Sequence, residues 1–180
     1  MSRKLKFRLQ KVILEIEEFE MPSGDYIKAV NHLLYINGIY TNRVITLPPQ
    51  PNRKMAHIYR NTDLGLFPNR CEGGTNLVLM EYMACGKPVI ASYLTGHRDI
   101  LTNENSLPIK SSHPFTLQAQ NGQILYRWNE PVLDEIISML EWAYCHRDEI
   151  RAIGNIAGED LIKLTWTESA KQFFELFTNC

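Results

Sequence analysis

Apolar residues recur along the chain with two spacings, one typical of helices and one typical of buried strands. Helical spacing marks residues 25–37, 52–60, 77–85 and several stretches after Pro131. Short apolar runs, typical of buried strands, occupy residues 44–47, 64–67 and 88–92. Because strands and helices alternate from Val44 to Trp128, we predict an α/β fold with a parallel, doubly wound sheet flanked by helices.

The second half of the chain is predicted to end in helices. Residues 102–123 are polar and contain two prolines, so we predict surface loops and edge strands, followed by a strand at residues 124–128. Pro131 is predicted as the first-turn proline of a helix. A further helix over residues 148–164 carries weak spots at Gly154 and Gly158. In a last helix from Trp166, Phe173, Phe174 and Phe177 follow helical spacing, and we predict that they pack against the core.

The N-terminal region, residues 1–41, is predicted as a separate helical segment of uncertain packing. Residues 2–20 follow the pattern of an amphipathic helix with a basic first half. One interpretation is a helix that lies on anionic lipid, which would give peripheral contact with the cytoplasmic face of a membrane. The interpretation that we favour is a packed helix with a solvated basic face. A second domain, residues 42–180, then holds the sheet and the C-terminal helices.

The composition excludes some classes of function. Hydrophobic residues make up 44% and charged residues 22% of the 180 residues, as in ordinary globular proteins. A formal net charge of −1 argues against a dedicated nucleic-acid binder. Four scattered cysteines without a Cys-x-x-Cys pair fit reduced thiols better than disulfides or zinc, and the histidines lack metal-ligand spacing. No apolar run approaches the ~18–20 residues of a membrane span, so we expect no membrane-spanning segment. The scattered, reduced cysteines favour a cytoplasmic protein.

The stretch with the clearest chemistry is residues 63–92, which divides into strand, glycine loop, helix and strand. Thr75 or Asn76 is expected to cap the helix, and Gly86 to end it in the left-handed conformation before Pro88. Such a unit places the loop at the carboxyl end of a parallel strand and at a helix N-terminus. Free backbone amides and the positive end of the helix dipole meet there, which favours phosphate binding.

Two carboxylates accompany the glycine loop. Glu72 precedes the glycines, and Glu81 lies about one turn inside the predicted helix. A pair so placed suits hydrogen bonds to the hydroxyls of two sugars, one hexose and one ribose. Gly73 and Gly74 allow a diphosphate to approach the backbone closely. Taken alone, however, Glu81 is equally compatible with an ordinary solvated helix residue.

The residues that carry a family resemblance are 63–70, Glu72-Gly73, 77–81, 83–91 and 95–97. Together they closely resemble the C-terminal, donor-binding domain of retaining GT-B glycosyltransferases of family 4 (group 1), which is typified by sucrose and glycogen synthases. The resemblance covers roughly residues 42–177 and includes Trp128 and Trp166 as later landmarks. It implies a Rossmann-like domain that is one half of a GT-B fold.

The resemblance also implies site residues and partners. Glu72 resembles the glutamate that contacts the transferred sugar near the reacting carbon, and Glu81 resembles the one that holds the ribose. The implied diphosphate cradle consists of the amides of Gly73, Gly74, Thr75, Asn76 and Leu77. The implied reaction moves a hexose from a nucleoside-diphosphate sugar to a hydroxyl of a glycan, lipid or small molecule, with retention. Neither a metal ion nor another cofactor is expected.

Three departures from the family pattern leave alternatives open. Eight residues separate Glu72 from Glu81, where the family has seven. The usual strand and glycine turn with an arginine and a lysine for the diphosphate is not found before Asp25, and Arg70 is the best substitute. The acceptor domain is also missing. We therefore expect either part of a full-length transferase, inactive alone, or a non-catalytic or split-enzyme nucleotide-sugar-binding fragment.

Two further questions stay open at this point. An epimerase or similar enzyme on the same fold is a third hypothesis, and the Glu72/Glu81 pair argues against it. His97 follows Thr95-Gly96 in a loop where donor sugar and acceptor would meet. It is compatible with a role there, but an ordinary polar loop residue is the interpretation that we favour.

Overall fold

The structure is a computed structural model that describes residues 23–39, 42 and 44–178. The predicted helix over residues 2–20 lies outside the described residues. The chain forms two compact units, Met1–Ile58 and Tyr59–Cys180. A domain boundary after residue 41 stays a prediction.

In the first unit, α1 spans Ser23–Ile36 and buries Val30 and Leu34, while Leu33 is 48% exposed. The predicted strand at residues 44–47 is wrong, because this segment forms no regular element and leaves Ile45 and Leu47 exposed. A strand needs a neighbour for its backbone N–H and C=O groups, and none of the pairings between described strands includes this segment. Helix α2, Asn52–Arg60, contains the division between the two units after Ile58, and it begins and ends where the sequence predicts.

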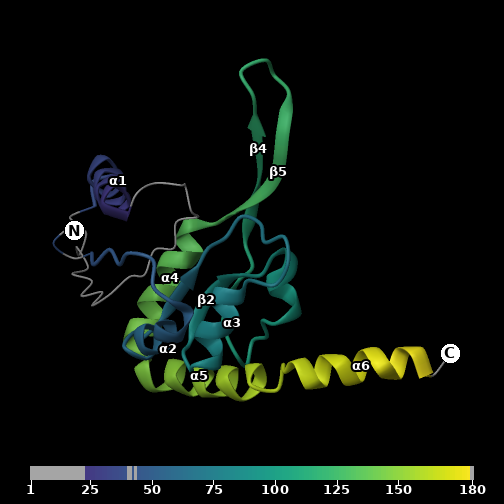
Figure 1. Cartoon of the computed structure of the whole chain (residues 1–180). Helices are drawn as coiled ribbons and strands as arrows, with labels where there is room; N and C mark the ends of the chain where they lie inside the picture. Colours follow the sequence, from purple (N-terminus) through teal and green to yellow (C-terminus); the bar gives the residue numbers. More distant parts are fainter. Residues whose placement is uncertain (1–22, 40–41, 43, 179–180) are drawn as a thin grey trace. The chain divides into compact units, whose positions relative to one another are not determined.

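The second unit is built on a parallel sheet of three strands in the order β1-β2-β3. These strands are β1 Gly65–Phe67, β2 Val89–Ser92 and β3 Leu107–Ile109. Strand β2 lies in the centre, pairs with both neighbours and is buried throughout, which explains its continuous apolar run. Figure 1 shows α3, Leu77–Ala84, and α4, Leu133–Cys145, flanking the sheet. Ile90, Ile109 and Ile136 form the buried cluster between the sheet and α4.

Helix α5, Arg147–Leu161, packs against the C-terminal end of α3 through glycines. A Cβ atom at Gly154 would lie 2.7 Å from the carbonyl oxygen of Gly86, and one at Gly158 would lie 3.1 Å from the Cα of Gly86. The two weak spots of the helix are therefore the points of closest backbone approach. Gly86 has φ +71°, as predicted for the residue that ends α3.

The region after β3 differs from the prediction in its connectivity. Strands β4, Ser112–Gln118, and β5, Ile124–Pro131, form an antiparallel hairpin outside the parallel sheet, and the hairpin projects from the rest of this unit (Figure 1). A strand at residues 124–128 is thus confirmed, but not as a member of the parallel sheet. Pro131 ends β5 rather than opening a helix, because it pairs with Ser112, and α4 begins two residues later.

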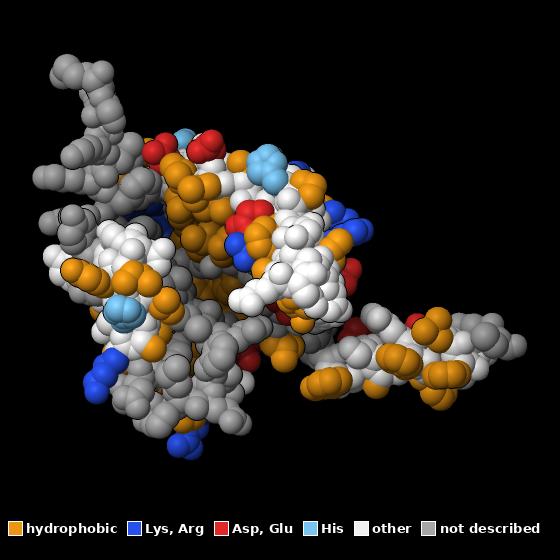
Figure 2. All heavy atoms as spheres, turned by 90° about the horizontal axis from the view of Figure 1, so that it is seen from above, with side chains coloured by type: hydrophobic (Ala, Val, Ile, Leu, Met, Phe, Trp, Pro, Cys, Tyr) orange, Lys and Arg blue, Asp and Glu red, His pale blue; other side chains and the backbone are white. Residues whose placement is uncertain are grey.

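The last helix, α6, Trp166–Thr178, begins at the predicted residue but does not pack as predicted. Trp166 is 92% exposed and Phe177 is 76% exposed, and α6 has no buried residue. The apolar side chains along its length are visible on the projecting helix in Figure 2. Within the described residues, no helix combines the length and the apolar character that crossing a membrane requires.

Candidate functional site

Two loops meet at the edge of the sheet where parallel strands end. The loop of residues 68–76 joins β1 to α3, and the segment after β2 forms the short 3-10 helix η2, Thr95–Asp99. Because β1 and β2 run parallel, their carboxyl ends lie at the same edge, and the loops that follow them are neighbours. The predicted crevice edge therefore carries both the glycine loop and the Thr-Gly-His segment.

The N-terminus of α3 is capped by Asn76, one of the two predicted residues. Its backbone is extended, and its Oδ1 atom accepts a hydrogen bond from the amide of Leu79 at 3.1 Å. Among the described residues, none accepts from the backbone amides of Gly73, Gly74, Thr75 or Leu77. These amide donors lie at the positive end of the α3 dipole, and such an arrangement favours the binding of an anion.

The glycine loop packs directly against η2. A Cβ atom at Gly96 would lie only 1.6 Å from the carbonyl oxygen of Gly74, so the two backbones touch and no larger residue fits at position 96. By contrast, a Cβ atom at Gly73 or Gly74 would meet no atom of the described part of the chain within 4 Å. The loop therefore contacts η2 at Gly74, while the space around the Cα atoms of Gly73 and Gly74 is open to a ligand among the described residues.

Glu72 is held at the start of this loop by its backbone and its side chain. Its amide donates to the hydroxyl of Thr95 at 2.8 Å, and its carboxylate accepts from the side-chain amide of Asn69 at 3.3 Å. Thr95 takes the left-handed conformation with φ 45°, which is unusual for a β-branched residue. This strained residue is the one whose hydroxyl fixes Glu72.

Glu81 lies on α3, half-buried, at the fifth residue of the helix. Its carboxylate accepts a hydrogen bond at 3.3 Å from the hydroxyl of Tyr59, a residue that is 2% exposed. The Tyr59 ring packs edge to face on Tyr82, with centroids 5.4 Å apart. The orientation of Glu81 is thus set by the aromatic core rather than left to solvent.

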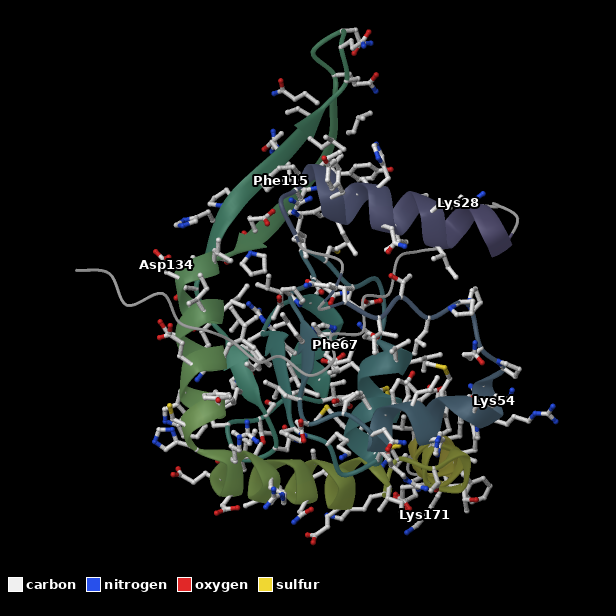
Figure 3. The ribbon with its side chains drawn as sticks, turned by 90° about the vertical axis from the view of Figure 1, so that its left-hand side faces the viewer. Lys28, Lys54, Phe67, Phe115, Asp134 and Lys171 are labelled. Atoms are coloured by element: carbon white, nitrogen blue, oxygen red, sulfur yellow. The ribbon has the colours of Figure 1, made fainter. Side chains whose placement is uncertain are left out.

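Arg70 is directed toward the hairpin. Its Nε atom pairs with Glu130 of β5, and its guanidinium lies over the ring of Phe115, 4.4 Å from the centroid. Phe115 is labelled on the hairpin in Figure 3. A guanidinium has five N–H donors, so this pairing leaves donors for another anion. A diphosphate contact by Arg70 stays a prediction, and the structure adds a tether between the glycine loop and the hairpin.

His97 is 1% exposed and does not behave as an ordinary polar loop residue. Its Nδ1 atom lies 3.0 Å from the carbonyl oxygen of Ser92, and its Nε2 atom lies 3.3 Å from the side-chain nitrogen of Asn76. Burial lowers the pKa of His97, while the Ser92 carbonyl and the nearby charge of Glu72 oppose this effect. The imidazole is therefore neutral near pH 7.

The structure gathers most of the predicted residues but adds others that the sequence did not assign. Residues 72–76 share one loop, and Leu77 begins the helix that carries Glu81. Thr95, His97 and Tyr59 were missed as supporting residues; only the Thr-Gly-His motif gave a signal, through the resemblance. Among the described residues, no group of three or more His, Cys, Asp or Glu side chains is arranged to hold a metal ion.

Comparison with known proteins decides the family. The model of the family "Glycosyl transferases group 1" matches residues 23–124, more than half of the chain. The chain belongs to the group 1 glycosyltransferases. This group 1 chain is 33% identical over 107 residues to the D-inositol 3-phosphate glycosyltransferase of Salinispora tropica, a match that covers 58% of the chain and 22% of that protein.

A second relative is the D-inositol 3-phosphate glycosyltransferase of Rhodococcus erythropolis, with 43% identity over 56 residues, 31% of the chain and 12% of that protein. The group 1 chain thus spans about a fifth or less of the length of these curated relatives.

Solved structures confirm the predicted α/β, Rossmann-like fold. The Anabaena HepE protein, in complex with UDP, matches with a TM-score of 0.63 at 17% identity, over 88% of this chain and 38% of that one. The sucrose-phosphate synthase of Thermosynechococcus elongatus matches with a TM-score of 0.63 at 20% identity, over 90% of this chain and 36% of that one. At these identities the likeness concerns the fold alone.

Proposed function

We propose that this group 1 chain is the donor-binding part of a glycosyltransferase that moves a hexose from a nucleoside-diphosphate sugar to a hydroxyl acceptor, with retention of configuration. The observation that carries the proposal is the capped N-terminus of α3, where the backbone amides of residues 73–75 and 77 donate to no acceptor among the residues that the structure describes. A diphosphate supplies the oxygen atoms that such amides bind. The match to the group 1 family supports the same role.

In this proposal the two glutamates and the loop amides have separate roles. Glu72 contacts the transferred sugar near the reacting carbon, and Glu81, oriented by Tyr59, accepts hydrogen bonds from the ribose hydroxyls. As the glycosidic bond to the diphosphate breaks, negative charge grows on the leaving oxygen atoms. Fixed amides and the α3 dipole stabilise that charge without reorganising, so the proposed chemistry needs no bound metal ion.

The proposed donor carries uridine, because a solved protein of the same fold was crystallised with UDP and with UDP-glucose. The acceptor hydroxyl, on a glycan, a lipid or a small molecule, is proposed to be bound by a domain outside this chain. We also propose action in the cytoplasm, since the described cysteines Cys71, Cys85 and Cys145 are free thiols, as a reducing compartment allows. Peripheral membrane contact by residues 2–20 stays a prediction.

Calorimetric titration with UDP, GDP and ADP tests the donor site. We expect binding of at least one nucleotide, with UDP favoured, and a loss of roughly 10- to 100-fold in affinity for Glu81→Gln, because a hydrogen bond to a charged group contributes about 1.5–3 kcal/mol. Glu141→Gln is the matched control, since Glu141 is also a half-buried carboxylate on a helix, α4. Absence of heat with all three nucleotides would refute the proposal.

A second candidate function is nucleotide-sugar binding without transfer, in a non-catalytic or split protein. The pairing of Arg70 with Glu130 favours it, because the best substitute for the family's diphosphate cations is engaged with the hairpin. A longer chain that includes the preceding domain distinguishes the two. Sugar transfer or slow release of free sugar from UDP-glucose by that chain supports the enzyme, whereas nucleotide binding with neither product supports the second candidate.

A further inference from the structure

Three successive hydrogen bonds link the end of β2 to the first turn of α3, and the imidazole of His97 makes two of them. The ring of His97 contacts the Ser92 carbonyl through Nδ1 at 3.0 Å and the Asn76 side-chain nitrogen through Nε2 at 3.3 Å. Asn76 in turn caps Leu79 at 3.1 Å. All of these contacts lie within the second unit, next to the glycine loop that Gly96 contacts.

The partners of this chain of bonds determine where each proton lies. The Oδ1 atom of Asn76 accepts from the Leu79 amide, so Asn76 turns its NH₂ group toward His97. The carbonyl of Ser92 can only accept, so Nδ1 of His97 must carry the hydrogen. Nε2 is then left with its lone pair and accepts from Asn76. A protonated imidazole would instead place an N–H group against the NH₂ group of Asn76.

We propose that His97 is a positioning residue for the nucleotide site: as a neutral imidazole with its hydrogen on Nδ1, it locks the Asn76 side chain and thereby the amides at the start of α3. The inference rests on the proposed function. Protonation of the ring releases Asn76 and loosens the amides that bind the diphosphate, so nucleotide affinity falls in acid through this contact.

The surroundings of His97 place this transition below neutral pH. From α3 and β2 the ring faces uncharged groups, the Asn76 side chain and the Ser92 carbonyl, and from the glycine loop it faces the carboxylate of Glu72. Arg98 and Asp99 follow it on its own segment, where the Arg98 side chain turns to Tyr93. Burial outweighs the attraction of Glu72 and lowers the pKa of His97 below its ordinary value of 6.5.

Two substitutions separate the contacts of the ring. In His97→Gln the side-chain oxygen can take the place of Nε2 and accept from Asn76, whereas in His97→Asn the side-chain nitrogen takes the place of Nδ1 and donates to Ser92. Each variant keeps one hydrogen bond and loses one, so we expect similar melting temperatures. With UDP in calorimetry we expect less than threefold weaker binding for His97→Gln and at least tenfold weaker binding for His97→Asn. Equal affinities for the two variants would overturn the inference.

The pH profile supplies a readout that a purely structural role would not move. UDP also titrates in mildly acidic solution, so the informative quantity is the ratio of wild-type affinity to that of His97→Gln, measured from pH 7.5 down through the pKa that NMR finds for His97. We expect this ratio to fall several-fold as the imidazole is protonated, because the variant has no titrating group at that position. A constant ratio would contradict the inference.

Nitrogen NMR of the wild-type chain tests the inference without any nucleotide or variant. Long-range proton–nitrogen spectra are expected to show the hydrogen of His97 on Nδ1, the minor form of free histidine, and a pKa below 6.5. A hydrogen on Nε2 would overturn the inference even if UDP binds. Conversely, the expected tautomer without UDP binding would refute the proposed function and also the role of His97 in it, so the two failures are distinguishable.

Discussion

Replacing Gly96 by alanine tests whether η2 positions the glycine loop. The new Cβ atom would lie 1.6 Å from the carbonyl oxygen of Gly74 and 2.5 Å from its carbonyl carbon. Because Cβ contacts below 3.0 Å essentially do not occur, the loop must retreat by about 1.4 Å. No atom of the described residues lies within 4 Å of a Cβ built on Gly73 or Gly74, so we expect the fold to survive this movement.

The stability cost of Gly96→Ala follows from the contacts that the retreat breaks. The principal one is the hydrogen bond from the Glu72 amide to Thr95. Together with weakening of the Asn76–His97 contact, this amounts to about 1–2 kcal/mol. For a chain of this size, such a loss lowers the melting temperature by roughly 2–8 °C.

The effect on ligand binding should be larger than the effect on stability. A retreat of about 1.4 Å is enough to break a hydrogen bond between a loop amide and the diphosphate, and a bond to a charged group contributes about 1.5–3 kcal/mol. We therefore expect UDP affinity to fall at least tenfold while the melting temperature changes only modestly. Calorimetry and thermal denaturation measure the two effects. Gly73→Ala controls for the stability effect of a methyl group in this loop, because a Cβ there lies within 4 Å of no atom of the described residues. Unchanged UDP affinity in Gly96→Ala would refute the reasoning.

Three further predictions concern groups around the site. Tyr59→Phe removes the hydrogen bond to Glu81 while keeping the ring, so nucleotide affinity in calorimetry should fall roughly 2- to 10-fold, and no change would show that Glu81 needs no orientation. Burial raises the pKa of Tyr82 to about 12, so the folded phenol keeps its proton after the unfolded one ionises near 10. The free energy of unfolding should therefore fall by roughly 2–3 kcal/mol between pH 10 and 12, as denaturant titrations can measure, and a curve as flat as that of Tyr82→Phe would contradict this. Arg70 and Glu130 are 45% and 43% exposed, so a double-mutant cycle for unfolding should give a coupling of about 1 kcal/mol or less, and a value above about 2 kcal/mol would show a stronger tether.

The sequence predicted those parts of the fold that local chemistry specifies. Helix α3 was bounded correctly because Asn76 and Gly86 act on residues within one turn of themselves. Strand β2 was found because its apolar run reflects burial on both faces. The glycine loop was assigned for the same reason: a strand, a cap and a helix in immediate succession leave few ways to arrange the amides.

The remaining features depend on contacts between distant residues, which periodicity does not reveal. The apolar run at residues 44–47 resembles a strand, but no described strand pairs with it. Residues 124–128 do form a strand, yet its partner is β4 rather than the sheet, and Pro131 was misplaced because that pairing extends to Ser112. The aromatic residues of α6 have helical spacing but are exposed in the described chain. For His97, burial arises from the approach of η2 to α3, which no single segment encodes.

The glycine contact between α5 and the end of α3 has a consequence for engineering. Gly154 and Gly158 of α5 pack against the residue that ends α3, and the N-terminus of α3 is the proposed anion-binding site. Mutant libraries that target the proposed nucleotide-sugar site should therefore leave both positions constant, because a methyl group at either one would displace α3.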